Sequence, residues 1–228
     1  MLRTDIEKLI KNDNFKGLLN KAGELHGHLC SYLTYGVLAG YIAVKELKIK
    51  CTGMEEAVAI VETNNCFSDG IQVVTGCTFG NNSLIYKDIG KTAVIVAKRD
   101  GTAIRIVLDP DFEDSREAKY PEAYEYWNKI IVKREEASSK EHEKMMQLFA
   151  EMSLQELNEP IDKMFRIKHL KVIVPEYAPF FNSVKCSICG EKIMESRARV
   201  KDGKPICITC GKLDCNRVDG SGVSTSIS

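Results

Sequence analysis

Apolar residues recur at helical spacing through the first quarter of the chain. Residues 4–7 have the form of a capping box, and the apolar positions that follow predict a short helix. Further helical patterns cover residues 15–22 and 32–47. Gly36 and Gly40 lie one turn apart on the last of these helices. Because glycine weakens a helix, we expect another backbone to approach closely there.

The middle of the chain has the pattern of strands. Short apolar or alternating runs occupy residues 57–61, 83–86, 92–98 and 102–108. Asp100-Gly101 is a strong signal for a hairpin between the last two runs. Ser68 is placed to cap a short helix over residues 69–75, which would separate the first strand from the second.

The second half begins with a charged segment and ends in small polar residues. Residues 115–151 have a helical pattern, residues 153–156 form another candidate capping box, and residues 167–174 predict one more strand that Pro175 ends. A linker is expected at residues 179–184. The Gly- and Ser-rich end, residues 218–228, predicts a disordered tail.

Composition describes an ordinary globular protein. The 228 residues are 44% hydrophobic and 28% charged, which excludes a disordered or collagen-like chain. Lys plus Arg equals Asp plus Glu at 32 each, so a protein that coats nucleic acid is not favoured. The sequence contains no apolar run long enough for a membrane span and no apolar core of a signal peptide. We therefore expect a cytoplasmic location, where cysteines more often bind metal or act in catalysis than form disulfides.

Four of the nine cysteines form a zinc-binding pattern. The pairs are Cys186-x2-Cys189 and Cys207-x2-Cys210. Two thiolates two residues apart can turn onto one ion, and two such pairs complete a tetrahedron. A segment of about 37 residues is too short for a stable apolar core, so zinc would supply its folding energy. Cys215 is left over and is not counted as a ligand.

The modest basic excess within residues 185–217 permits contact with nucleic acid but does not require it. A folding and interaction module is the favoured interpretation of this segment.

A second group of candidate ligands lies before the long helix. His26, His28 and Cys30 occupy alternate positions, which share one face of an extended segment. Gly27 would let a turn direct both rings into one cavity. Imidazole and thiolate suit zinc, nickel, copper or iron. A lowered pKa at the helix start would favour the Cys30 thiolate.

Cys66 and Cys77 flank the short helix over residues 69–75. They could join the histidines only if the fold brings the two segments together. The alternative is that His26 caps a helix, His28 is exposed and the cysteines are small buried hydrophobic residues. An aromatic group is read as helix packing: Tyr120, Tyr124, Tyr126 and Trp127.

These motifs resemble the formylmethanofuran dehydrogenase E-subunit family. The resemblance is carried by the sequence HGHLC at residues 26–30, by NCFSDGIQ at 65–72 and by TGCTFGN at 75–81. The C-terminal pairs resemble the treble-clef zinc finger that many members carry. The resemblance implies an α+β core with an antiparallel sheet packed by helices over residues 1–180, followed by the finger over residues 181–217.

The resemblance also implies a homodimer and a link to the molybdenum or tungsten enzyme that reduces carbon dioxide onto methanofuran in methanogenesis. Its cavity residues, carried over by motif, are His26, His28, Cys30, Cys66 and Cys77, with Asp69 and Gln72 nearby as cofactor-binding candidates. The first hypothesis is therefore a protein of one-carbon or redox metabolism, an oxidoreductase or a component of one. It would hold a second transition metal, zinc, nickel or iron, in the core.

Within this hypothesis the catalytic candidates are Cys30, Cys77 and His26. Metal would hold a substrate at an open position, or a thiol would act as the redox group. The alternative hypothesis is a regulatory or accessory zinc-finger protein that binds a partner protein or, less favoured, nucleic acid, without catalysis.

Overall fold

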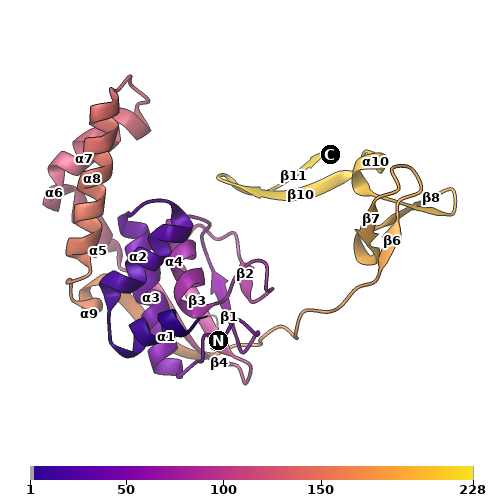
Figure 1. The fold of residues 1–228 in the computed structure, drawn as a ribbon, viewed down its shortest axis with the longest axis horizontal. Coiled ribbons are helices and arrows are strands. Elements are labelled where there is room, and N and C mark those ends of the chain that lie inside the picture. Colours follow the sequence, from indigo (N-terminus) through magenta and orange to yellow (C-terminus); the bar gives the residue numbers. More distant parts are fainter. Residues whose placement is uncertain (1–2, 228) are drawn as a thin grey trace. The chain divides into compact units, whose positions relative to one another are not determined.

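The computed structural model describes residues 3–227, with the side chains of residues 3–225. The chain divides into two compact units, Met1–Val174 and Pro175–Ser228. The boundary falls before Pro175 rather than at residue 180, because residues 172 and 174 still pack on the sheet of the first unit. Figure 1 labels the helices and strands.

The N-terminal unit is an α+β domain, as expected. Its helices are α1 Thr4–Lys11, α2 Phe15–His26, α3 Ser31–Leu47, α4 Cys66–Thr75, α5 Pro110–Asp114, α6 Arg116–Lys119, α7 Pro121–Trp127, α8 Ser139–Glu156 and α9 Ile161–Met164. A π-helical turn, Asn128–Val132, follows α7. Its strands are β1 Ala57–Val61, β2 Leu84–Tyr86, β3 Ala93–Lys98, β4 Thr102–Leu108 and β5 Phe165–Lys171.

The sheet is mixed and has the order β2-β1-β3-β4-β5. The β1, β3, β4 and β5 strands are antiparallel neighbours, but β2 runs parallel to β1, with Ala59 opposite Leu84. The expectation of an antiparallel sheet is therefore wrong at this edge. The reason is that α4 carries the chain back across the sheet before β2, so β2 starts at the same end as β1.

One hydrophobic core joins the helices to the sheet. Alternate residues of the strands, such as Val94, Val96 and Ile104, pack with apolar residues of α1–α4. The α3 helix is buried along nearly its whole length, which explains its lack of a polar face. The α7 and α8 helices lie side by side beyond the sheet, and α8 also contacts α3.

Three expected helix caps differ from the structure. Arg3, not Thr4, precedes α1, and its side chain donates to the carbonyls of Cys51 and Val73 instead. Asn65, not Ser68, caps α4, because its side chain accepts from the Phe67 amide at 3.0 Å. The predicted box at residues 153–156 lies inside α8, whose real capping box begins at Ser138 and ends at residue 141.

The C-terminal unit consists of three small hairpins and one short helix. Its elements are β6 Ser183–Lys185, β7 Lys192–Met194, a 3-10 turn Glu195–Arg197, β8 Arg199–Lys201, β9 Lys204–Ile206, α10 Ile208–Gly211, β10 Asp214–Asp219 and β11 Gly222–Ile227. The β10 strand pairs with β11 over its whole length. The disordered tail expected from residue 218 is thus replaced by a hairpin up to residue 227, and residue 228 lies outside the described residues.

Within the described part of the chain, none of the helices combines the length and hydrophobicity that a bilayer span requires.

Candidate metal centres and a cavity

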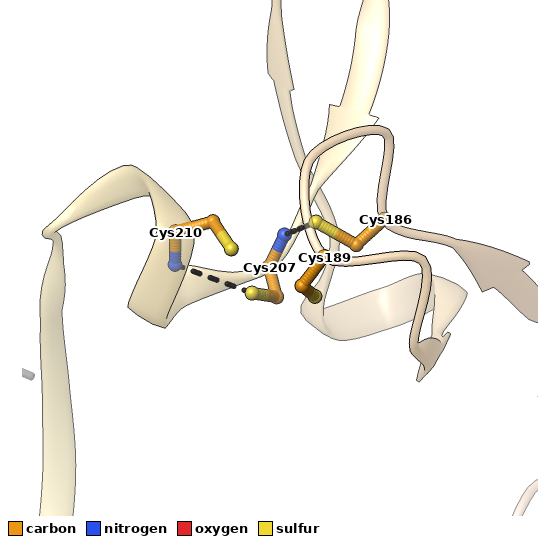
Figure 2. Close-up of side chains that lie close together, drawn as sticks. All are labelled: Cys186, Cys189, Cys207 and Cys210. Atoms are coloured by element: carbon orange, nitrogen blue, oxygen red, sulfur yellow. Dashed lines mark hydrogen bonds between the residues drawn. The ribbon is translucent and has the colours of Figure 1, made fainter.

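The four cysteines of the C-terminal unit converge as predicted. Cys186 and Cys189 lie in the turn between β6 and β7, whereas Cys207 follows β9 and Cys210 lies in α10. Their sulfur atoms all lie within 4.8 Å of one another (Figure 2). Zinc–sulfur bonds of about 2.3 Å require sulfurs at this kind of spacing, so the cluster suits a tetrahedral ion.

Backbone amides already point at these sulfurs. The Cys207 amide donates to Cys186 Sγ at 3.3 Å, and the Cys210 amide donates to Cys207 Sγ at 3.2 Å (Figure 2). Amides of Cys189 and Cys207 lower the pKa of the Cys186 thiol to about 6. Cys186 therefore favours the thiolate, which is the form that binds zinc, whereas the hydrogen bond with Cys207 raises the pKa of the Cys210 thiol to about 12. Cys215 lies on β10 and does not belong to the cluster.

The position of the core site follows from the close packing of α3 on α4. A Cβ atom at Gly36 would lie 2.0 Å from the Phe67 carbonyl oxygen, and one at Gly70 would lie 2.5 Å from the Val37 nitrogen. One turn further along, Gly40 faces Val74. The two helices thus run in the same direction with their backbones in contact, as the two glycines of α3 predict. Their N-termini consequently lie together, with Cys30 before α3 and Cys66 at the start of α4.

His26, His28 and Cys30 form the second candidate metal centre. One ligand atom from each lies within 4.8 Å of the others, and all three residues are half-buried. The centroids of the His26 and His28 imidazole rings lie 4.5 Å apart. Gly27 ends α2 with a φ of 94°, a left-handed conformation that glycine adopts without strain. This turn directs both histidine side chains to one place.

Asp69 and Gln72 orient His26. The His26 Nδ1–H donates to Asp69 Oδ2 at 2.7 Å, because a carboxylate can only accept. The Gln72 amide donates to the other Asp69 oxygen at 3.1 Å. The His26 Nε2 lone pair is left facing Cys30 Sγ at 3.9 Å. A carboxylate behind a histidine is the arrangement that fixes a metal-binding imidazole, so both residues act through His26 and are not themselves among the grouped ligands.

Cys66 lies against the same site. A hydrogen bond from the Cys30 thiol lowers the pKa of Cys66 to about 6, and the same pairing together with burial raises the pKa of Cys30. The start of α4 also favours a thiolate at this position. Burial, and then the neighbouring His26, lower the pKa of His28. A neutral imidazole and a thiolate are the protonation states that a transition metal requires.

Cys77 does not join this group, which corrects the sequence-based prediction. It is 3% exposed, and its thiol donates to the Ala57 carbonyl at 3.6 Å. Burial raises its pKa, and its neighbours include Thr75 and Ser83. Cys77 follows the C-terminal end of α4, whereas Cys66 begins this helix, and ten residues of helix span about 15 Å. The interpretation of a cysteine as a small buried hydrophobic residue therefore holds for Cys77, whereas the half-buried Cys66 packs on the core and also lines the cavity beside Cys30.

A cavity of about 420 Å³ opens beside His28, Cys30 and Cys66. Its remaining lining comes from α3, α6, α7, the π-helical turn and α8, and consists of Ser31, Tyr32, Arg116, Tyr124, Trp127, Ile131, Met145, Met146 and Phe149. The walls are thus mostly aromatic and aliphatic, as is usual for a small-molecule site. The candidate metal centre lies at one end of a pocket that can hold a ligand.

Part of this lining is not evident from the sequence. The pattern of residues 115–151 assigns Tyr124 and Trp127 to helix packing, and nothing in it singles out Arg116. The aromatic spacing of α7 was the available signal, but it does not distinguish a pocket wall from a helix contact. Only the position of α7 beside α8 places these rings in the same cavity as His28.

Comparisons with known proteins agree with this architecture. The family described as "FmdE, Molybdenum formylmethanofuran dehydrogenase operon" matches residues 25–166, which include the core site. The family described as "Prokaryotic dksA/traR C4-type zinc finger" matches residues 181–212, which include the four cysteines.

Two individual proteins are similar over most of the chain. A "Probable S-adenosyl-L-methionine-binding protein" of Archaeoglobus fulgidus is 40% identical over 198 residues, which are 85% of this chain and 52% of that protein. The chain thus spans about half the length of this curated relative. The crystal structure of a tungsten formylmethanofuran dehydrogenase FmdE-like protein from Syntrophus aciditrophicus has a TM-score of 0.54 and 20% identity. It covers 86% of this chain and 91% of its own, and it shows a shared fold.

The family match spans more than half of the chain and contains the sequence HGHLC, Asp69 and Cys66. The chain therefore belongs to the FmdE family and carries a C4-type zinc finger after its core domain.

Proposed function

We propose that the core of this protein is a transition-metal centre that binds a small molecule. His26 Nε2, His28 and Cys30 would be its ligands, and the adjoining cavity would give access to an open coordination position. The observation that carries the proposal is the hydrogen bond from His26 Nδ1 to Asp69 at 2.7 Å, since it leaves Nε2 free beside a thiol and a second imidazole.

The ligand set favours zinc, with nickel or iron as other metals that imidazole and thiolate accept. A bound ion with an open position would act as a Lewis acid on a substrate oxygen or bind a substrate thiolate. The protein itself would fix the two imidazoles, supply the neighbouring Cys66 thiolate and exclude water with the aromatic walls. Membership of the FmdE family supports a role in one-carbon or redox metabolism, as an oxidoreductase or a component of one.

Replacing Asp69 with asparagine should weaken metal binding at the core while leaving the finger unaffected. The variant keeps the size of the side chain but removes the negative charge that holds the His26 imidazole. Loss of such a partner typically lowers metal affinity about 10- to 100-fold. Competition with a chelator, followed by measurement of the metal left per chain, would quantify the change.

The matched control is Asp13→Asn. Asp13 accepts from Tyr41 and Lys45 on the surface, so this variant should retain the wild-type metal affinity. Equal affinity in Asp69→Asn and wild type would show that Asp69 does not support a ligand.

A second candidate function is binding of S-adenosylmethionine in the same cavity. The name of the Archaeoglobus relative suggests this ligand, and the aromatic lining favours it. Tyr124, Trp127 and Phe149 could stack on adenine, and tyrosine rings attract a sulfonium cation. Equilibrium dialysis with labelled S-adenosylmethionine tests this function, and absence of binding at millimolar ligand would exclude it.

The binding partners of this protein are proposed from its family resemblance. A homodimer is expected from the family resemblance, as is association with a molybdenum or tungsten enzyme. The alternative accessory role, in which the finger binds a protein or nucleic acid without catalysis, is less favoured, because the net charge of zero gives nucleic acid little long-range attraction. Light scattering on the purified protein measures the oligomeric state directly.

A further inference from the structure

Buried polar atoms with incomplete hydrogen bonding gather around Glu156, and two of them belong to residues that line the cavity. In the described part of the chain, the buried side-chain atoms that lack a hydrogen-bond partner are Ser31 Oγ, Arg116 Nε, Tyr120 Oη and Glu156 Oε2. They share one neighbourhood, since Glu156 interacts with the other three residues. Ser31 and Arg116, which are 1% and 3% exposed, line the cavity. Glu156 is the shared electrostatic partner of this group, and Arg116 and Ser31 are its two members that also face the cavity, where they are placed to bind a polar ligand.

Arg116 is held rigidly at this place. Its guanidinium lies over the rings of Tyr32, Tyr35 and Tyr124, with centroid distances of 5.1, 5.3 and 5.8 Å. Such contacts stabilise a cation away from water. Arg116 thus presents a fixed positive charge and a planar set of donors, the geometry that suits a carboxylate.

The carboxylate of Glu156 pairs with Arg116 but does not use all of its hydrogen-bond donors, so the guanidinium can still bind a ligand. Arg116 Nε lies 3.3 Å from Glu156 Oε1, but this ion pair includes no hydrogen bond from Nε. The same Glu156 oxygen accepts from the Tyr35 hydroxyl at 2.6 Å. The other nearby acid, Glu113, accepts from Tyr32. None of the described residues that line the cavity is acidic, and Arg116 is the one arginine or lysine among them.

We propose that this cavity binds a small carboxylic acid with an aromatic or branched apolar body. The carboxylate would accept hydrogen bonds from Arg116 and Ser31. The apolar body would lie against Trp127 and Phe149. The inference names the ligand class of the metal centre and so rests on the proposed function, but the binding experiment below does not require the metal to be catalytic.

The full-length, metal-loaded protein offers a direct assay. Trp127 is the single tryptophan of the chain and lines the cavity, so its fluorescence reports occupancy there. The probes are 4-phenylbutyrate and its neutral amide, which share one apolar body. We expect the acid to bind at least about tenfold more tightly than the amide, because a hydrogen-bonded charge pair replaces a neutral contact.

The variant Arg116→Gln/Glu156→Gln removes both charges together, so no buried charge is left unpaired. The acid should lose its tenfold preference in this variant, and the amide should bind as before. Arg166→Gln, which changes an exposed arginine on β5, is the control and should keep the preference. Circular dichroism confirms that each variant is folded.

Equal affinity of acid and amide in the wild-type protein would overturn the proposal without the use of any variant. So would the absence of any fluorescence change with either probe, or a preference that persists in the folded double variant. The metal content, measured on the same samples, separates this result from the proposed metal centre. If the protein keeps its second metal ion but binds the acid and the amide equally well, the carboxylic acid ligand is rejected and the proposed metal centre is not.

Discussion

The Cys207→Ser variant is expected to lose one metal ion per chain and to unfold the C-terminal unit. Within the described residues, the buried cluster of this unit contains only Cys186, Ile206 and Cys207, with Ile193 and Cys210 beside it. So small a core cannot offset the conformational entropy of the unit. Zinc binding supplies about 10–16 kcal/mol in such fingers, and loss of a ligand removes much of it.

Limited proteolysis would show this as rapid cleavage after Val174, while the N-terminal unit survives. Cys215→Ser is the matched control, because Cys215 lies outside the cluster, and it should resist cleavage as the wild type does. A Cys207→Ser protein that keeps its metal and resists the protease would show that the finger folds without zinc.

The Gly36→Ala variant is expected to destabilise the N-terminal unit by about 3 kcal/mol or more. Alanine is the better helix former by about 1 kcal/mol, so helix propensity alone predicts the opposite sign. Packing decides the outcome, because the new Cβ would meet the Phe67 carbonyl oxygen at 2.0 Å, and this backbone atom cannot rotate away. The α3 and α4 helices would have to separate, which would also disturb Cys30 and Cys66.

Urea denaturation followed by circular dichroism measures this change in the free energy of unfolding. The control is Gly80→Ala, where a Cβ meets no atom within 4 Å, and its change should stay within about 0.5 kcal/mol. If Gly36→Ala is as stable as this control, α3 and α4 are not in backbone contact.

The features that sequence predicted well are local. The finger follows from the spacing of four cysteines. The grouping of His26, His28 and Cys30 was also expected, although a left-handed turn at Gly27 after α2, not an extended segment, brings them together. The contact of α3 with another backbone followed from Gly36 and Gly40. The two clusters need only a few residues with fixed spacing, and the two glycines indicate that some backbone approaches α3 but not that it belongs to α4.

The features that could not be predicted from the sequence depend on tertiary packing. The sequence gives no reason to prefer Cys66 or Cys77 as a ligand. In the structure Cys66 begins α4 and Cys77 follows its other end, so only Cys66 can lie near the histidines. Arg116 lies in a charged segment whose pattern suggests a solvated helix. Its burial depends on tyrosines of α3 and α7 and on Glu156 at the end of α8. Likewise the pairing of β11 with β10 could not be inferred from a stretch of small polar residues.

The metal content of purified chains tests the central claim most directly, together with anomalous scattering to locate each ion. We predict two ions per chain in the wild type and one in His28→Ala/Cys30→Ser, with the remaining ion in the finger. Cys77→Ala should keep both. One ion per chain in the wild type, unchanged in His28→Ala/Cys30→Ser, would contradict a metal centre in the core.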